Sequence, residues 1–240
     1  NIRPQYGDQL SIGLYKNFRS NTIETSVETY YRKMQDVPDY KSGAQLVLNH
    51  HIETDVFGTN GKAYGVELMI KKLTGKLNGW ISYTWSRTFL QMNDSTKGLV
   101  INRGEYYPAN FDKPHDVTFV RNYRFSHRVS LSLNTTYITG RPITIPIGKF
   151  FYAGSMRALY SDRNAYRIPD YFKVDLSMNI EGNHKVKQKT HNSWTFGVYN
   201  MLGRKNPYSV YFVSENGVIN GYKLSIFGAA IFYANFNIRF

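Results

Sequence analysis

The 240-residue sequence contains no cysteine, so disulfide staples and thiolate metal sites are excluded. It has no run approaching the roughly 20 consecutive apolar residues that a membrane helix requires. Helical periodicity is scarce as well, because apolar residues almost nowhere recur three and four positions apart. Neither a disulfide-stapled module nor a helical membrane protein fits these absences.

Acidic residues are also few, with 17 Asp and Glu against 30 Lys and Arg, which gives a formal net charge of +13. Nucleic acid is the usual partner of such an excess. The basic residues are scattered, however, and no single helix or loop concentrates them. We therefore expect no nucleic-acid binding and place these side chains near lipid headgroups, where Lys and Arg meet phosphate. They include Lys71, Lys72, Lys76, Arg124, Arg128, Lys185, Lys187 and Lys189.

Aromatic residues are abundant, with 20 Tyr and 15 Phe. Tyr suits a membrane interface because its ring is apolar and its hydroxyl is hydrated. In the last nine residues, 232–240, the even positions are apolar and the odd positions are mostly polar. A lipid-facing barrel strand shows this alternation, but a strand of a soluble sandwich also does.

The same period-two pattern recurs along the chain and predicts nine strands. Residues 62–72 alternate most cleanly, with Tyr64, Val66, Leu68 and Ile70 on one face. In the eighth strand, Gly203 and Pro207 should interrupt regular pairing. The nine predicted strands are 9–19, 23–34, 62–72, 77–92, 116–125, 129–139, 171–180, 194–212 and 222–240.

The connections between these strands alternate in length. The turns after strands one, three and five are short, and the segment 181–192 after strand seven is modest and charged. The connections after strands two, four and six have about 20 to 30 residues each. Outer-membrane barrels place short turns in the periplasm and long loops outside the cell. The predicted fold class is therefore all-β, an antiparallel transmembrane β-barrel.

The odd strand number has its own implication, because single-chain bacterial barrels have an even number of strands. The sequence also shows no secretory leader pattern. We expect residues 1–240 to be the C-terminal part of one barrel domain, with the earlier strands absent from this sequence.

Several segments resemble the C-terminal barrel of TonB-dependent outer-membrane receptors, particularly those of Bacteroidota with a carboxypeptidase-regulatory-like domain and a plug. The resemblance rests on four segments and the terminal Phe240, in the family's order over nearly the whole chain. The segments are Ala63 to Glu67 (AYGVE), Tyr137 to Pro142 (YITGRP), Arg167 to Asp175 (RIPDYFKVD) and Tyr199 to Pro207 with Tyr208 (YNMLGRKNPY). Barrels of this family have about 22 strands around a plugged lumen.

The resemblance implies a receptor in the Gram-negative outer membrane that imports a nutrient of the siderophore, glycan or peptide class, without catalysis or a cofactor. This segment would form barrel wall and external loops. The implied partners are outer-membrane lipid and lipopolysaccharide, the barrel assembly machinery, the receptor's own plug and remaining strands, and TonB through the N-terminal part. A surface lipoprotein over the barrel is a further partner that the sequence leaves open.

Three sets of candidate site residues follow from these patterns. The loop 140–167 combines cations with aromatic rings, a combination that suits an anionic siderophore, a glycan or a peptide terminus, although packing of the loop on its neighbours explains it equally well. Its candidate ligand contacts are Arg141, Lys149, Tyr152, Arg157 and Arg163. The candidate lumen-facing residues are Trp80, Lys173, Asp175 and Tyr199, which would pack on a plug or touch substrate. The expected assembly signal is Phe236, Ile238 and Phe240.

Other chemistry is not favoured. His50 and His51 lie close to Glu53 and Asp55, but adjacent residues of an extended loop point to opposite sides, so we predict no metal site. The same geometry separates His115 from Asp116 and disfavours an acid–base pair. Two alternatives to the receptor stay open: a passive porin or adhesion barrel, and a soluble secreted glycan-binding β-sandwich. A sandwich would bury Val66, Leu68, Ile70, Leu131, Leu133, Val174 and Leu176 between two sheets, whereas a barrel would expose them.

Overall fold

The computed structural model describes residues 3–41, 44, 48–95, 98–182, 190–215, 218–226 and 228–239. In these residues one large antiparallel sheet follows the chain as a meander, in the order β1-β2-β3-β4-β8-β9-β14-β15-β18, and β7 pairs with β4 beside β8. Its strands are β1 (Tyr6–Phe18), β2 (Ile23–Tyr40), β3 (Val56–Lys72), β4 (Leu77–Gln91), β7 (Tyr107–Pro108), β8 (His115–Arg124), β9 (Val129–Ile138), β14 (Tyr171–Glu181), β15 (His191–Tyr199) and β18 (Ile231–Arg239).

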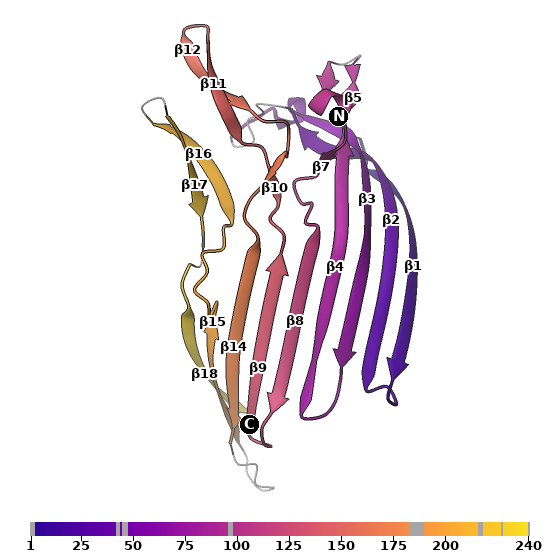
Figure 1. Cartoon of the computed structure of the whole chain (residues 1–240), viewed down its shortest axis with the longest axis vertical. Helices are drawn as coiled ribbons and strands as arrows, with labels where there is room; N and C mark the ends of the chain where they lie inside the picture. The colour runs from indigo at the N-terminus through magenta and orange to yellow at the C-terminus, as the bar shows by residue number, and fades with distance from the viewer. Residues whose placement is uncertain are drawn as a thin grey trace.

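Four further two-stranded sheets lie in the long connections, outside the large sheet (Figure 1). They are β5 (Asn93–Asp94) with β6 (Leu99–Val100), β10 (Pro142–Ile143) with β13 (Tyr166–Arg167), β11 (Pro146–Tyr152) with β12 (Ser155–Tyr160), and β16 (Ser209–Glu215) with β17 (Val218–Leu224). Two short 3-10 turns, Ile52–Thr54 and Asn102–Gly104, complete the elements of the described residues.

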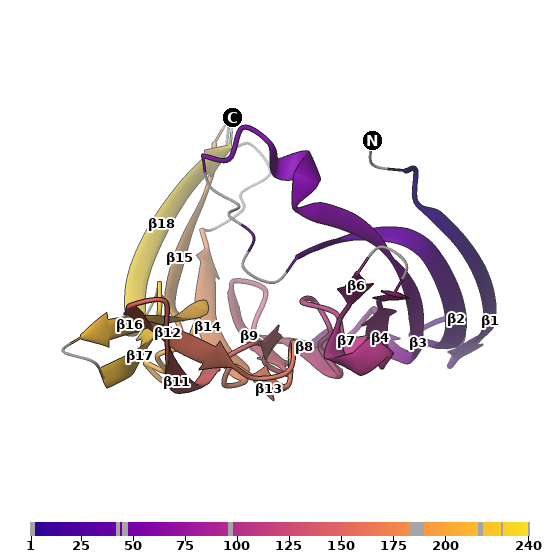
Figure 2. The same ribbon diagram turned by 90° about the horizontal axis from the view of Figure 1, so that it is seen from above.

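The predicted alternation of connection lengths is confirmed. The short turns 19–22, 73–76 and 125–128 lie at one end of the sheet, which we call the turn end, and the long connections lie at the other, the loop end (Figure 1). Seen from above, the sheet bends into an arch with the chain termini at its two sides (Figure 2). Such curvature is expected of a partial barrel.

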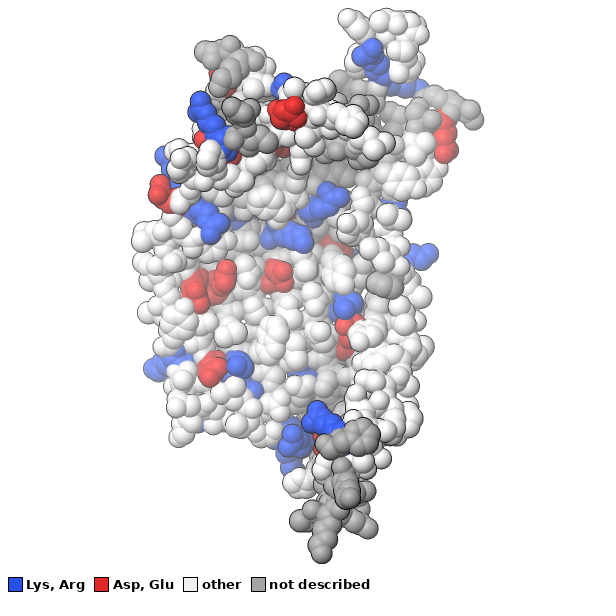
Figure 3. Space-filling model, turned by 180° about the vertical axis from the view of Figure 1, so that it is seen from behind, with Lys and Arg blue, Asp and Glu red and all other residues white. Residues whose placement is uncertain are grey.

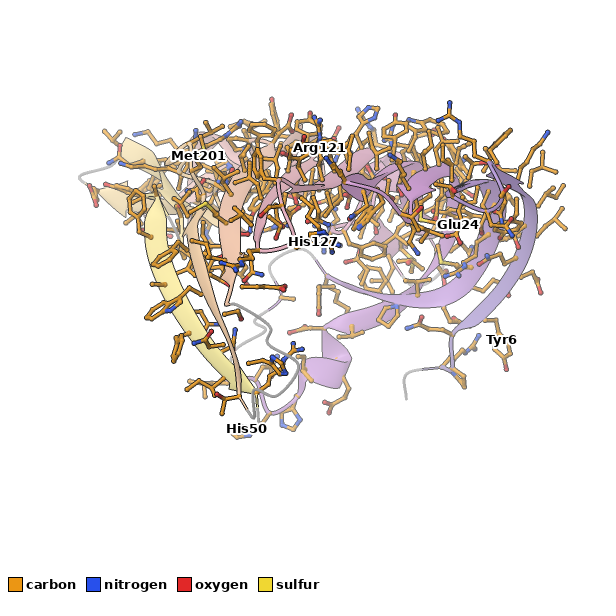
Figure 4. The ribbon with its side chains drawn as sticks, turned by 90° about the horizontal axis from the view of Figure 1, so that it is seen from below. Tyr6, Glu24, His50, Arg121, His127 and Met201 are labelled. Atoms are coloured by element: carbon orange, nitrogen blue, oxygen red, sulfur yellow. The ribbon has the colours of Figure 1, made fainter. Side chains whose placement is uncertain are left out.

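The two faces of the arch differ in polarity. On the convex face Val27, Leu68 and Tyr83 are register partners, whereas on the concave face Glu28, Glu67 and Thr84 are partners. Figure 3 shows Lys, Arg, Asp and Glu side chains spread over the concave side. Figure 4 places Arg121 on the convex side and Glu24 inside the arch. The polar face is therefore the inner one, as in a membrane barrel.

The residues that distinguish a barrel from a sandwich are not buried under a second sheet. Leu68 and Ile70 are 38% and 53% exposed. Val66, Leu131, Leu133, Val174 and Leu176 are all at least partly exposed. Because a sandwich would bury this whole set, the sandwich alternative is wrong.

Four of the nine strand predictions are wrong in their bounds. The predicted eighth strand, 194–212, ends at Tyr199, where Asn200 (φ 51°) and Gly203 (φ 61°) turn the chain away from the sheet. The predicted ninth strand, 222–240, divides into β17 and β18, so 200–230 is a fourth long connection that carries the hairpin β16–β17. Strand β2 also continues beyond its predicted end at Met34, across a bulge that precedes Val37. Its partner β3 begins at Val56, before its predicted start at Lys62.

A small hydrophobic core lies at the loop end, where the connection between β4 and β8 folds over the ends of β2, β3 and β4. Tyr107 and Ala109 are fully buried or nearly so. The other members of this cluster are Val37, Phe57, Leu90, Met92 and Ile101. None of the described helical turns is long or apolar enough to cross a membrane.

Candidate functional site

The four candidate lumen residues all lie on the concave face. Trp80 is the register partner of Lys71 and Val120, while Lys173, Asp175 and Tyr199 gather on β14 and β15. The Lys173 Nζ lies 2.8 Å from Asp175 Oδ2 and 5.9 Å from the centre of the Tyr199 ring. Trp80 lies three strands away from this group. Contact of these residues with a plug or a substrate stays a prediction.

A cavity of about 780 Å³ extends from this group toward the loop end, within the usual size range of small-molecule sites. Its wall combines cations with aromatic and apolar side chains. Six of its lining residues carry the chemistry discussed below: Lys113, Arg141, Tyr171, Lys173, Tyr199 and Tyr208. The loop candidate Arg141 and the strand candidates Lys173 and Tyr199 therefore share one cavity.

Asp170 fastens the base of the loop between β9 and β14. Its Oδ1 accepts a hydrogen bond from the Gly140 N–H at 2.9 Å, and its Oδ2 accepts one from the Tyr137 hydroxyl at 2.7 Å. The Gly140 N–H, followed by the Tyr137 hydroxyl, lowers the pKa of the Asp170 carboxyl. Gly140 is required here, because a Cβ would lie only 1.7 Å from the Ile168 carbonyl oxygen.

Asp112 is a second anchor of the same loop and, unlike Asp170, it is buried. Its carboxylate accepts hydrogen bonds from the Thr88 N–H at 2.7 Å, from the Arg87 guanidinium at 3.4 Å and from the Arg167 guanidinium. Arg167 also donates to the carbonyl oxygens of Asp112 and Gly140, at 2.8 and 2.9 Å. The side chain of Asp112 has no exposed surface, so these donors replace its hydration completely.

Arg163, a candidate ligand contact, lies in a third buried cluster. Its Nη1 donates to Asp39 Oδ2 at 2.8 Å, and the Tyr107 hydroxyl donates to the same oxygen at 2.5 Å. Burial, followed by the hydrogen bond to Asp39, raises the pKa of Tyr107. Only 16% of the Arg163 side chain is exposed, so the structure gives this guanidinium an anchoring position; ligand contact by Arg163 stays a prediction.

The other three loop candidates lie on the hairpin β11–β12, which projects beyond the sheet (Figure 1). Tyr152 is 61% exposed, and the Arg157 guanidinium lies 5.2 Å from the centre of its ring. Lys149 is exposed and is the register neighbour of Ala158. The structure therefore divides the five candidates among a cavity, a buried anchor and a projecting hairpin.

Two of the three residues of the predicted assembly signal lie in described parts of the chain, and their role as a signal stays a prediction. Phe236 and Ile238 lie on the convex face of β18, opposite Trp194 and Asn192. The rings of Phe236 and Trp194 are 4.5 Å apart. Phe240 lies outside the described residues, as do Lys185, Lys187 and Lys189.

His115 and Asp116 are neighbours at the start of β8. His115 pairs with Trp85 and Asp116 pairs with Thr84, so their side chains leave opposite faces of β8. In the part of the chain that the structure describes, no three His, Asp or Glu side chains lie close enough together to hold a metal ion.

The sequence reading missed the asparagines that fix the connection between β15 and β18. The Asn200 N–H donates to Asp175 Oδ1 at 2.9 Å, and its side-chain amide donates to the Arg204 carbonyl at 3.0 Å. Asn206 bonds both the N–H and the carbonyl of Phe172, each at 2.9 Å. Asn200 has a positive φ, which Asn tolerates better than most residues. An Asn followed three residues later by Gly203 was therefore the sequence signal for a turn at this position.

Curved antiparallel architecture, an apolar convex face and long loops at one end define this class of protein as the wall of an outer-membrane β-barrel. A family model described as TonB dependent receptor-like, beta-barrel matches residues 1–201. The chain belongs to the TonB-dependent receptor-like β-barrel family.

Solved structures with the same fold are distant in sequence. The ferripyoverdine receptor of the Pseudomonas aeruginosa outer membrane is 11% identical, with a TM-score of 0.57, over 99% of this chain and 28% of that one. The FpvAI–pyocin S2 complex is 11% identical, with a TM-score of 0.59 and the same coverage of both chains. The outer membrane transporter YddB from Escherichia coli is 12% identical, with a TM-score of 0.61, over 98% of this chain and 33% of that one. A search of curated proteins finds no match.

The chain thus spans about a third or less of the length of these structural relatives. Their shared fold confirms a partial outer-membrane barrel.

Proposed function

We propose that this chain is the C-terminal wall of a TonB-dependent transporter that imports a nutrient across the outer membrane of a Gram-negative cell. Additional strands would pair with β1 and β18 and close a barrel of about 22 strands around a plug. The membership of the chain in the receptor family supports this proposal. A Bacteroidota origin and a carboxypeptidase-regulatory-like domain upstream stay predictions.

The observation that carries the proposal is the cavity at the loop end of the concave face. In a closed barrel this position lies just beneath the external loops, on the path of an incoming solute. The wall of the cavity is formed by strand residues such as Lys173 and Tyr199 and by residues of three long connections, such as Lys113, Arg141 and Tyr208. Asp170 ties the β9–β14 connection to Tyr137 of β9, and Asn200 and Asn206 tie the β15–β18 connection to Asp175 and Phe172 of β14.

The lining favours a ligand that is both anionic and partly apolar. Lys113, Arg141 and Lys173 contribute positive charge, and only Lys173 has a carboxylate partner within 4 Å among the described residues. Tyrosine rings supply flat apolar surface and hydroxyl donors. A siderophore of this chemistry is supported by the similarity to a ferripyoverdine receptor; glycans and peptides with an anionic group remain within the proposed class.

The test measures energised uptake by the full-length receptor in cells that lack other copies of it. Radiolabelled ferric siderophores, acidic oligosaccharides and peptides are supplied in turn, with TonB functional or inactivated. We expect one class to accumulate only when TonB is functional, and Arg141→Gln to raise the half-saturating concentration. The matched control is Arg103→Gln, an exposed loop-end arginine that does not line the cavity. Equal uptake with functional and with inactivated TonB would overturn the proposal.

A passive porin or adhesion barrel is the other candidate. The network at the loop end argues against an open pore, because the anchors Asp39, Asp112 and Asp170 hold the long connections over the sheet. Conductance of purified full-length protein in a planar bilayer distinguishes the two. A porin conducts continuously, whereas a plugged receptor stays closed.

A further inference from the structure

The convex face near the turn end carries isolated positive charge. In the turn-end half of the convex face, the described strand residues include three cations and no Asp or Glu. The cations are Lys16, Lys72 and Arg121. The carboxylates at this end of the sheet, Glu24 and Glu181, lie on the concave face, and Glu24 is paired there with Lys71 at 3.5 Å. A surface that meets lipid thus presents cations without counter-charges.

Two of these cations flank a single glycine. Lys72 and Arg121 are register partners of Gly79 from its two sides, β3 and β8. Since neighbouring strands are about 4.8 Å apart, the two Cα atoms are separated by roughly 10 Å. Gly79 places no side chain between them. The result is a slot with one cation on each side and bare backbone as its floor.

The backbone keeps this slot open. Gly79 has φ +145°, and a Cβ built on it would lie 2.0 Å from the Val120 carbonyl oxygen and 2.9 Å from the Arg121 Cα. A larger residue therefore cannot fill the space without moving β8. The close approach of β4 and β8 requires glycine at position 79. Because this glycine has no side chain, the slot between Lys72 and Arg121 stays open on the convex face.

The surroundings of the slot match the two parts of a lipid. On the side of the membrane centre, the next row of convex residues is Ile70, Ile81 and Phe119. On the side of the turns, Tyr123 and Phe125 meet edge to face at 4.7 Å. The first row suits acyl chains, and the aromatic pair is typical of the headgroup level.

Neither cation has a polar partner in the part of the chain that the structure describes. Within the described residues, no hydrogen bond or ion pair of the Lys72 ammonium or the Arg121 guanidinium is found. The ammonium of Lys72 extends toward the turn, since it lies 3.7 Å from where a Cβ of Gly75 would be. An arginine on a lipid-facing surface destabilises a barrel unless it reaches the interface and meets an anion there.

We infer that Lys72, Gly79 and Arg121 form a binding site for the phosphodiester of an anionic phospholipid in the periplasmic leaflet. The phosphate lies over Gly79 between the two cations, and its acyl chains run along Ile70, Ile81 and Phe119. This inference rests on the proposed function, because it takes the convex face to meet lipid and the turn end to be periplasmic. The site lies on the outer wall of the barrel and does not depend on which substrate is transported.

Native mass spectrometry of the detergent-solubilised full-length receptor tests the site. Phosphatidylglycerol and phosphatidylethanolamine are titrated separately onto the wild type and the double variant Lys72→Gln/Arg121→Gln. Arg121→Gln alone is also titrated, and its matched control is Arg124→Gln, which removes one charge from the same strand but from the concave face, where Arg124 is the partner of Ser130. Arg121→Lys, which keeps the charge, is a second variant.

Each cation near a membrane surface strengthens binding of an anionic lipid about fivefold. We expect the double variant to bind phosphatidylglycerol about 25-fold more weakly, while the Arg124→Gln and Arg121→Lys variants stay close to wild type. Phosphatidylethanolamine should bind weakly to every variant, and inorganic phosphate should not displace phosphatidylglycerol. Displacement by inorganic phosphate would show an anion site without lipid selectivity and would overturn the inference.

Equal phosphatidylglycerol binding by the wild type and the double variant would also overturn it, as would an equal loss in Arg124→Gln. Heat-modifiable migration on gels is recorded for every variant. A receptor that migrates as a folded barrel but shows no site-dependent lipid binding refutes this inference alone. A protein that never forms a heat-modifiable barrel refutes the proposed function.

Discussion

At the scale of single residues, three aspartates hold the long connections at the loop end; Asp39 and Asp112 are buried, and Asp170 is partly exposed. Asp39, Asp112 and Asp170 each accept hydrogen bonds from groups that are distant in sequence. A buried carboxylate is stable only when such donors replace its lost hydration. These residues therefore determine where the long connections lie, and through them the shape of the cavity.

Asp112 provides the sharpest stability test. Asp112→Asn should lower the free energy of unfolding by about 1–3 kcal/mol, because it leaves Arg87 and Arg167 without their carboxylate. Asp162→Asn is the matched control: Asp162 pairs with Arg103 at 3.0 Å, but both side chains are mostly exposed, so less than about 1 kcal/mol is expected. Denaturant unfolding of the full-length receptor in lipid vesicles measures both. Equal effects would contradict the anchoring role of Asp112.

Asp170 makes the base of its loop sensitive to acid. Its pKa is lowered in the folded state from the ordinary value of 3.8. Its contribution to stability is therefore complete above 3.8 and is lost as the pH falls through the lower folded-state value. Hydrogen exchange should show falling protection of the Gly140 N–H at low pH in the wild type. In Asp170→Asn that protection should be weak at every pH, and a pH-dependent loss surviving in this variant would exclude Asp170 as the cause.

At the scale of elements, period-two alternation predicted five of the nine main strands to within three residues at each end, and it missed the loop-end extensions of β2 and β3. Alternation works because one face of each strand meets lipid and the other does not. It failed after Tyr199, because Tyr211, Tyr222 and their neighbours in the hairpin β16–β17 alternate like wall strands although they pair only with each other. The anchors Asp39 and Asp112 were not predictable, since their partners lie 124 and 55 residues away.

The assigned faces predict opposite outcomes for neighbouring substitutions on β3. Leu68→Arg puts a charge on the convex face and should lower the free energy of unfolding by about 2–4 kcal/mol if that position is near the bilayer centre. Met69→Arg puts the same charge on the concave face and should have a clearly smaller effect. Folding titrations of the two full-length variants in vesicles make the comparison. A larger loss for Met69→Arg would reverse the assignment of faces.

At the scale of the whole molecule, the apolar band of the convex face has the height of a membrane. Along β3 the convex residues run from Lys62 through Tyr64, Val66, Leu68 and Ile70 to Lys72. Ten residues span about 33 Å along a strand. With the usual tilt of 35–45° this gives a band of roughly 25 Å between the two lysines. The band, the polar concave face and the one-sided loops together account for an outer-membrane wall.

The most direct test of this account is a spin-label scan of residues 62–72 in the full-length receptor reconstituted in vesicles, aided by the absence of cysteine from this chain. Accessibility to oxygen and to a water-soluble nickel chelate is measured at each position. The account predicts a period of two, with oxygen access high and nickel access low at Val66, Leu68 and Ile70, and with the lowest nickel access near Leu68. Nickel access that is high at all three positions, or that shows no period of two, would contradict it.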